Sequence, residues 1–236
     1  MASLLYATQY AINDYISIKI PTVGEIIDNE DLYYDIVCSI IATPYEMMVQ
    51  LDDNGIDFTT INAFDLFCIM FKHLKEIDTS LVFGETDLKD FEYATSQVNE
   101  NMVLWNPKTD AVIDRAIHDQ ICAFLRKMLY MPKSDKSPGN EEAKKYMIER
   151  ARIKQNRKKN KKKESQLEKL IISLVNTAEF SYNYETVRKM SVYQFYASLK
   201  QISQKIRFDN TMIGCYAGTV KFDELSQDEK TWIQIE

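Results

Sequence analysis

Two histidines, His73 and His118, are the side chains best suited to acid–base chemistry near neutral pH, and the chain has no others. Each lies beside apolar positions, and no third residue is spaced to orient either imidazole ring as a catalytic triad requires. The sequence also lacks the motifs GxGxxG, GxxxxGKS/T, HExxH and GxSxG, which serve phosphate binding, zinc binding and nucleophilic attack. We therefore expect both histidines to be structural and the protein not to be an enzyme.

Three aspartates, Asp52, Asp53 and Asp57, surround Gly55 and superficially resemble a calcium-binding loop. When Gly55 is aligned with the invariant glycine of such a loop, the first ligand position holds glutamine. The twelfth position, which needs a bidentate glutamate, then holds isoleucine. The sequence therefore predicts no metal site and no cofactor, and we expect the aspartates to cap helices and shape the turn.

The four cysteines, Cys38, Cys68, Cys122 and Cys215, are far apart and form no CxxC pair. Isolated thiols of this kind are typical of reduced, buried cysteines in a protein of the cytoplasm. The mean hydropathy is −0.33, and the apolar runs are far shorter than the roughly 20 residues that a membrane-spanning helix needs. Because no secretory signal is apparent at the amino end, we expect a soluble cytoplasmic protein.

Residues 144–163 carry a concentrated positive charge. This window holds eleven Lys or Arg residues and one acid, a local charge of +10, whereas the whole chain has a net charge of −6. Everything outside the window therefore has a net charge of −16. The residues of this candidate basic patch are Arg150, Arg152, Lys154, Arg157, Lys158, Lys159, Lys161, Lys162 and Lys163.

Two interpretations of the basic run stay open. Its side chains could neutralise nucleic-acid phosphates and gain affinity through counterion release. However, Tyr146 is the one aromatic residue available there for base stacking, and no zinc-finger, RNP or homeodomain signature accompanies the run. The second interpretation is a solvated helix or connector that attracts the acidic remainder of the chain or an acidic protein partner. We favour the second interpretation.

Apolar residues crowd most densely between positions 36 and 74, where they predict two core helices. Pro44 has no backbone N–H, so a helix is expected to restart there with Thr43 as its cap. A second helix is predicted after Asn62, which has the spacing of a capping box with Asp65. Its apolar residues recur every three or four positions, which predicts a wide buried face.

β-Structure is predicted at two places. Residues 16–20 alternate apolar and polar side chains, as a half-buried strand does. Residues 100–105 and 110–114 are joined by a four-residue loop with Asn-Pro, which indicates a β-hairpin. We expect residues 1–15 to form a short helix or an arm, and residues 79–91 to form a loop or a short strand.

Further helices are predicted on both sides of the basic run. Thr22 and Asp114 stand at the start of apolar helical patterns and are expected to cap them. The basic run should continue directly into an amphipathic helix that ends near Asn176. Ser191 should cap the last of three short helices.

The predicted fold class is therefore mainly α, an irregular multi-helix bundle with a small β-hairpin element. We divide the chain into an amino-terminal helical domain at residues 1–133, with the hairpin near 100–114, and a basic linker or helix at 134–163. A small carboxy-terminal helical bundle follows at residues 164–236.

Several segments resemble phage proteins. Residues 20–25, 43–51 and 55–58 resemble proteins encoded in the tail-gene region of phages and prophages of low-GC Gram-positive bacteria. Residues 181–195 are similar to a short motif of phage tail assembly chaperones and related baseplate-assembly proteins, in which a Ser/Thr cap separates two helices. The basic run has no counterpart in that pattern. The resemblance implies a non-enzymatic protein that helps to build a phage tail or baseplate.

A chaperone of this family would hold the apolar surface of another tail protein, such as the tape measure, until that protein is incorporated. Methionine and aromatic side chains adapt well to irregular apolar partners. The candidate partner-binding residues are Met47, Met48, Phe64, Phe67, Met70 and Phe71. The alternative is that these residues form the protein's own core.

Two other functions stay open. A structural subunit of the virion tail or baseplate would remain in the particle, whereas a nucleic-acid-binding protein would use the basic segment. The expected partners are tape-measure or baseplate proteins, with a second copy of the chain or nucleic acid as further options and no membrane. The resemblance places the protein in the host cytoplasm during assembly, with the virion as a second location.

Overall fold

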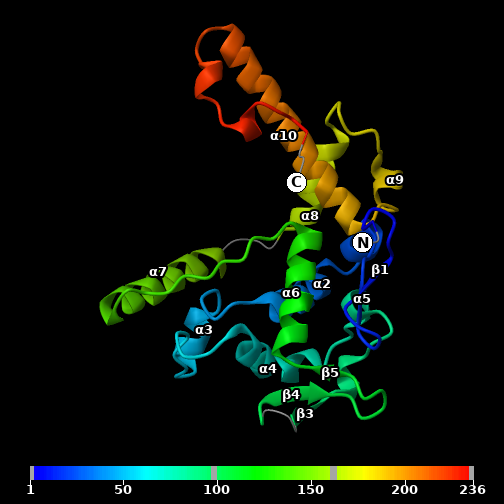
Figure 1. The fold of residues 1–236 in the computed structure, drawn as a ribbon, viewed down its shortest axis with the longest axis vertical. Helices are drawn as coiled ribbons and strands as arrows, with labels where there is room; N and C mark the ends of the chain where they lie inside the picture. The colour runs from blue at the N-terminus through cyan, green and yellow to red at the C-terminus, as the bar shows by residue number, and fades with distance from the viewer. Residues whose placement is uncertain (1–2, 97–99, 160–163, 234–236) are drawn as a thin grey trace.

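The computed structural model describes residues 3–96, 100–159 and 164–233, with all their side chains except those of Lys158 and Lys159. Most of this chain is helical, and two small antiparallel sheets accompany the helices. The predicted fold class, mainly α with a small β element, is confirmed. Two long helices, α7 (Glu141–Lys159) and α10 (Val192–Tyr216), leave the central body in different directions (Figure 1).

The elements follow one another along the chain without a repeating unit. The first half contains β1 (Gln9–Ala11), β2 (Ser17–Lys19), α1 (Val23–Ile27), α2 (Glu30–Ile41), α3 (Met48–Asp53), α4 (Ala63–Leu74), α5 (Ser80–Phe83), η1 (Leu88–Asp90), β3 (Glu92–Thr95), β4 (Met102–Trp105) and β5 (Val112–Ile113). The second half contains α6 (Arg115–Leu129), α7, α8 (Gln166–Val175), α9 (Tyr184–Val187), α10, η2 (Phe222–Glu224) and η3 (Gln227–Glu229).

Side-chain caps begin several helices where the sequence predicts them. Asn62 accepts a hydrogen bond from the backbone N–H of Asp65, whose carboxylate accepts one in return from the Asn62 N–H. Thr22 and Ser191 make the same reciprocal capping box at the starts of α1 and α10. Asp114 caps α6. These bonds satisfy backbone donors that a helix cannot satisfy by itself.

The predicted hairpin is confirmed. Strands β4 and β5 pair antiparallel, with Leu104 opposite Ile113, and β3 pairs with the other edge of β4. The predicted strand at residues 16–20 is also present as β2. Its partner is β1, so the prediction of a helix or arm for residues 1–15 was wrong. A lone strand leaves its backbone groups unpaired, and the short β1 satisfies them.

Two other local predictions were wrong. Residues 79–91 form α5 and η1 instead of a loop or strand, because Val82 and Phe83 turn inward and are fully buried. The helix expected to restart at Pro44 begins at Met48. Thr43 does exchange hydrogen bonds with Glu46, but its hydroxyl also donates to the Ser134 carbonyl oxygen. Residues 44–47 therefore form a turn held by the hydrogen bonds of Thr43, and not the first turn of a helix.

One large apolar cluster fills the body of the molecule. Helix α2 packs against α4 and α6, and the first turns of α10 pack against α6. The cluster also takes side chains from α8 and α9, such as Leu167 and Val187. Side chains from both the predicted amino-terminal and carboxy-terminal parts therefore share one core. The division into domains itself stays a prediction.

The backbone also joins these two parts. The N–H groups of Val23 and Gly24 donate to the carbonyl oxygens of Met190 and Arg188, each at 2.9 Å, and the N–H of Val192 donates to the Pro21 oxygen at 2.8 Å. A Cβ at Gly24 would lie 2.9 Å from the Arg188 oxygen, closer than a real Cβ approaches. Glycine at this position therefore permits the close approach of the two segments.

The carboxy-terminal part differs from the three short helices predicted. Helix α10 runs for 25 residues and continues through Gly214. Beyond the left-handed Gly218, the chain turns back and the Val220 N–H bonds to the Gly214 oxygen. A Cβ at Gly214 would lie 2.9 Å from the Val220 side chain. Glycine therefore closes this turn against the helix, and η3 follows in the returning tail.

Candidate partner-binding surfaces

Helix α7 lies against α3 and the turn that follows it, outside the main core (Figure 1). Three side chains of α7, Met147, Ile148 and Ala151, pack on a second, smaller cluster of buried residues. That cluster contains Ala42, Met48, Val49, Leu51, Phe58 and Leu66. The apolar contact is small, and ion pairs between α7 and the chain around Gly55 accompany it.

The acidic turn identified in the sequence supplies the carboxylates of these ion pairs. Lys144 Nζ lies 2.8 Å from the Asp57 carboxylate, and Arg152 pairs with both Asp52, at 2.9 Å, and Asp53. The hydrogen bond from Lys144, together with bonds from Thr59, lowers the pKa of Asp57 to about 2. Asp57 thus shapes the turn as predicted, and all three aspartates pair with cations of α7. The prediction that they cap helices was wrong for the neighbouring helices, because the caps of α3 are Met47 and Asn54 and the N-cap of α4 is Asn62.

A groove opens between α7 and α3 on the side away from these ion pairs. It has a volume of about 1190 Å³. Its lining combines apolar residues of both helices with basic residues of α7 and the segment before it. The apolar lining residues are Met48, Val49, Met147, Ala151 and Ile153, and the basic ones are Lys136, Arg150, Lys154 and Arg157. We call this hollow the α3–α7 groove.

The structure divides the predicted basic patch into two sets. Arg152 faces the acidic turn, whereas Arg150, Lys154 and Arg157 line the α3–α7 groove. The guanidinium of Arg150 lies 5.5 Å from the ring centre of Tyr146. No carboxylate among the described residues forms an ion pair with these three groove cations. Lys158 and Lys159 belong to α7, but their side chains are not described, and Lys161, Lys162 and Lys163 lie outside the described residues.

The six candidate partner-binding residues also divide. Phe64, Phe67 and Phe71 are buried in the main cluster, and Met48 is buried in the second cluster and lines the groove. Met47 and Met70 are half-buried against the second cluster. Four of the six are therefore buried in the protein's own apolar clusters. That a partner contacts any of them stays a prediction.

The histidines occupy two different environments. His73 is exposed and lies 2.8 Å from the Asp35 carboxylate. His118 is fully buried, and its Nε2–H donates to the Ile40 carbonyl oxygen at 3.0 Å. The thiol of Cys122 lies 3.3 Å from the same ring nitrogen. His118 and Cys122 are four residues apart on α6, and this spacing could have identified the pair from the sequence.

Burial opposes nucleophile chemistry at the pair. It lowers the pKa of His118, although the bond to Ile40 acts in the opposite direction, and it raises the pKa of Cys122 to about 12. A thiolate–imidazolium pair needs the reverse shifts. All four cysteines are free. The prediction of buried thiols is confirmed at Cys68 and wrong at Cys38, which is exposed, while Cys122 and Cys215 are half-buried. Within residues 3–96, 100–159 and 164–233, no cluster of His, Cys, Asp or Glu could hold a metal ion.

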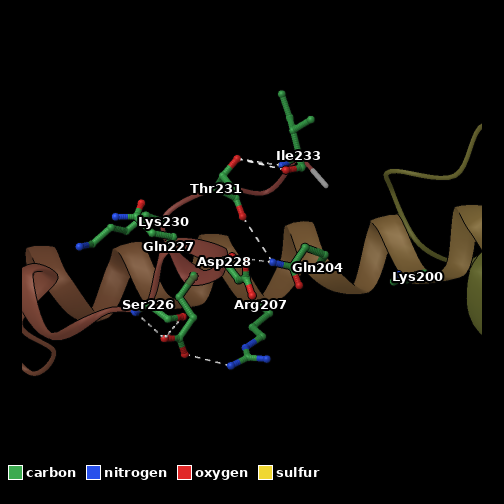
Figure 2. A pocket seen from close by; sticks show the side chains of 10 residues that line it. Lys200, Gln204, Arg207, Ser226, Gln227, Asp228, Lys230, Thr231 and Ile233 are labelled. Atoms are coloured by element: carbon green, nitrogen blue, oxygen red, sulfur yellow. Dashed lines mark hydrogen bonds and ion pairs between the residues drawn. The ribbon is translucent and has the colours of Figure 1, made fainter. Parts of the chain in front are cut away.

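A second hollow lies between α10 and the chain that follows it (Figure 2). It has a volume of about 700 Å³ and is lined mainly by polar side chains. Gln204 donates to the carbonyl oxygens of Asp228 and Thr231, and Arg207 pairs with Glu229 at 2.9 Å. Figure 2 shows these bonds crossing the space between helix and tail. The returning tail therefore satisfies the polar face of α10 from within the chain.

Sequence reasoning did not identify the α3–α7 groove as a site. Lys136, Met147 and Ile153 line it, and none of them was among the candidates. A signal was available, because Lys144, Ile148 and Arg152 are four residues apart and must share one helix face. Because the acidic turn meets that face, the adjacent face of α7 stays open and forms one wall of the groove.

Comparison with known proteins adds one finding. Residues 158–235, about a third of the chain, match the family model described as YomV second domain. YomV is a prophage-encoded protein of the Gram-positive genus Bacillus, so the match indicates a phage association. No curated protein and no solved structure matches the chain significantly. In the described part of the chain, no helix is long and apolar enough to cross a membrane.

The matched region contains α8, α9, α10 and the returning tail, together with the segment whose resemblance to tail assembly chaperones was noted in the sequence. The lining residues of the α3–α7 groove all lie outside it. The phage association implied by that resemblance is thus supported. The tail-assembly role stays a prediction.

Proposed function

We propose that this protein is a non-enzymatic phage assembly factor that binds another tail or baseplate protein in the host cytoplasm, as a tail assembly chaperone does. Two observations support the proposal. The carboxy-terminal third matches a domain family of a prophage protein. The α3–α7 groove offers a large open surface with apolar side chains from two helices.

The groove is the observation that carries the proposal. Its volume of about 1190 Å³ exceeds the roughly 300–1,000 Å³ of a typical small-molecule pocket. The half-buried side chain of Met147 can adjust to the shape of an apolar partner. Ile153, which is 48% exposed, would gain burial when such a partner binds.

Affinity capture from phage-producing cells tests the proposal. A tagged chain should recover a tail or baseplate protein, and the substitution Ile153→Glu should reduce the recovery about tenfold, because it places a charge in an apolar contact. Ile172→Glu is the matched control, since Ile172 is 47% exposed on α8 and lies away from the groove. Equal recovery by both variants would contradict a role for the groove.

Mass spectrometry of purified particles separates the two structural roles. An assembly chaperone should be absent from mature particles, whereas a tail or baseplate subunit should be present at a fixed copy number that follows the symmetry of the particle. Capture of no phage protein, together with presence in the particle, would overturn the chaperone role.

A further inference from the structure

We infer that the α3–α7 groove binds an acidic, amphipathic helical segment of the partner protein. This inference rests on the proposed function and adds the chemistry of the partner. It follows from three features of the groove: its apolar floor, its basic rim and its length.

The floor requires apolar side chains from the occupant. Ile153 of α7 is 48% exposed there, and Met147 and Ala151 are half-buried beside it, while Met48 and Val49 of α3, each 5% exposed, close the bottom of the groove. An amphipathic helix in a groove contributes such side chains at positions i, i+3, i+4 and i+7. Phosphates are poorly suited to this floor, because a charged group loses its hydration there without gaining a hydrogen-bond partner.

The rim requires negative charge. Arg150, Lys154 and Arg157 recur every three or four residues along α7, so they form one row beside the floor. Glu46 is the one carboxylate in the described lining, and Thr43 and Arg126 already engage it. Carboxylates of an occupant would therefore meet unpaired cations with little repulsion.

The length of the row sets the size of the occupant. The groove residues of α7 extend from Tyr146 to Arg157. At about 1.5 Å per residue, this is roughly 17 Å, or about three turns of a facing helix. Tyr146 is the one aromatic residue on this stretch of α7, and the Arg150 guanidinium lies 5.5 Å from its ring centre, so one face of the ring already has a cationic neighbour that competes with base stacking.

Fluorescence anisotropy with a designed probe tests this inference. The probe is a labelled, three-turn helical peptide with leucines on one face and glutamates on the other. We expect it to bind the full chain, and a peptide with lysines in place of the glutamates not to bind. In the triple variant Arg150→Glu, Lys154→Glu, Arg157→Glu, the Kd for the acidic peptide should rise at least about tenfold.

The matched control reverses three exposed lysines elsewhere, Lys72→Glu, Lys127→Glu and Lys189→Glu, and so changes the net charge equally. It should retain the affinity of the unmodified chain. Equal loss in both triple variants would show that only the overall charge matters and would overturn the inference. Failure of the acidic peptide to bind, or equal binding of the lysine peptide, would also overturn it.

Two further measurements identify other occupants. Tighter binding of a DNA or RNA oligonucleotide than of the acidic peptide, abolished by the groove triple variant, would assign the rim to nucleic acid. A dimer in size-exclusion chromatography that the groove triple variant dissolves would assign the groove to a second copy. Capture of a phage protein that survives the groove reversal would overturn the inference while the proposed function stands.

Discussion

Helices α7 and α10 both extend beyond the main core, but they use their polar side chains in opposite ways (Figure 1). In α10, glutamine and arginine side chains bind the returning tail, so several polar groups of this helix find partners within the chain. In α7, one row of cations is anchored on the acidic turn and the next row lines an open groove. The row of α7 cations in the groove thus has no carboxylate partner among the described residues, whereas α10 donates hydrogen bonds to its own tail and forms an ion pair with it, and Ile213 and Tyr216 near its end stay exposed.

The largest expected effect is on the free energy of unfolding, and it separates the two halves of α10. Phe195 is fully buried in the main core, and Ile213, five turns further along, is 64% exposed. Phe195→Ala should lower the free energy of unfolding by about 3–5 kcal/mol, because it leaves a cavity. Ile213→Ala should change it by less than about 0.5 kcal/mol. Urea unfolding measures both, and similar losses would show that the far half of α10 also belongs to the core.

Removal of the ion pairs between Arg152 of α7 and the aspartates Asp52 and Asp53 should have the next largest effect, which is on amide exchange in α7. In the double variant Asp52→Asn, Asp53→Asn, Arg152 loses both carboxylate partners. Amide exchange across α7 should then become several times faster, while that of α2 stays unchanged. The control, Asp223→Asn with Asp228→Asn, alters the charge equally in the tail. Unchanged exchange in α7 would mean that the apolar contact alone holds this helix.

The pKa of Asp57 tests the other ion pair of α7, which joins Lys144 to Asp57. Its pKa is about 2, below the ordinary value of 3.8, so its charge favours the docked helix above pH 3.8, and this contribution is lost as the pH falls through about 2. Lys144→Met should raise the pKa toward 3.8 without reaching it, since the bonds from Thr59 remain. Carbon NMR of the Asp57 carboxyl group measures the midpoint. An unchanged midpoint would exclude Lys144 as the main cause.

The smallest expected effect is on the rate at which trypsin cleaves the tail that follows α10. Gln204→Ala removes two hydrogen bonds to tail carbonyl oxygens, but Gln201 still donates to Trp232 and Arg207 still pairs with Glu229. Trypsin should therefore cleave after Lys230 only a few times faster. Gln227→Ala, in the same hollow, is the control. A fully released tail would show that Gln204 is its main tether.

Local signals explain why much of the fold could be predicted. The capping box at Asn62 and the hairpin loop after Trp105 are determined by neighbouring residues, and both are found where the sequence places them. The start of α3 could not be predicted in this way. It depends on a hydrogen bond from Thr43 to Ser134, which lies 91 residues away in the chain.

The candidate site was harder to predict than the fold. The sequence shows that residues 144–163 are basic, but not which cations face inward. Arg152 and Arg150 are two residues apart, yet one meets the acidic turn and the other lines the groove. Helical spacing alone separates Arg150 from the face of Arg152. Which of the two faces meets α3 and its turn depends on a tertiary contact that no local pattern encodes.

Hydrogen exchange of the complex with the captured phage protein tests the central claim most directly. If the partner binds in the α3–α7 groove, amides in α3 and in the groove stretch of α7 should become protected, and those in the far half of α10 and its tail should not. Protection confined to α10 and the tail, with α3 and α7 unchanged, would contradict the account.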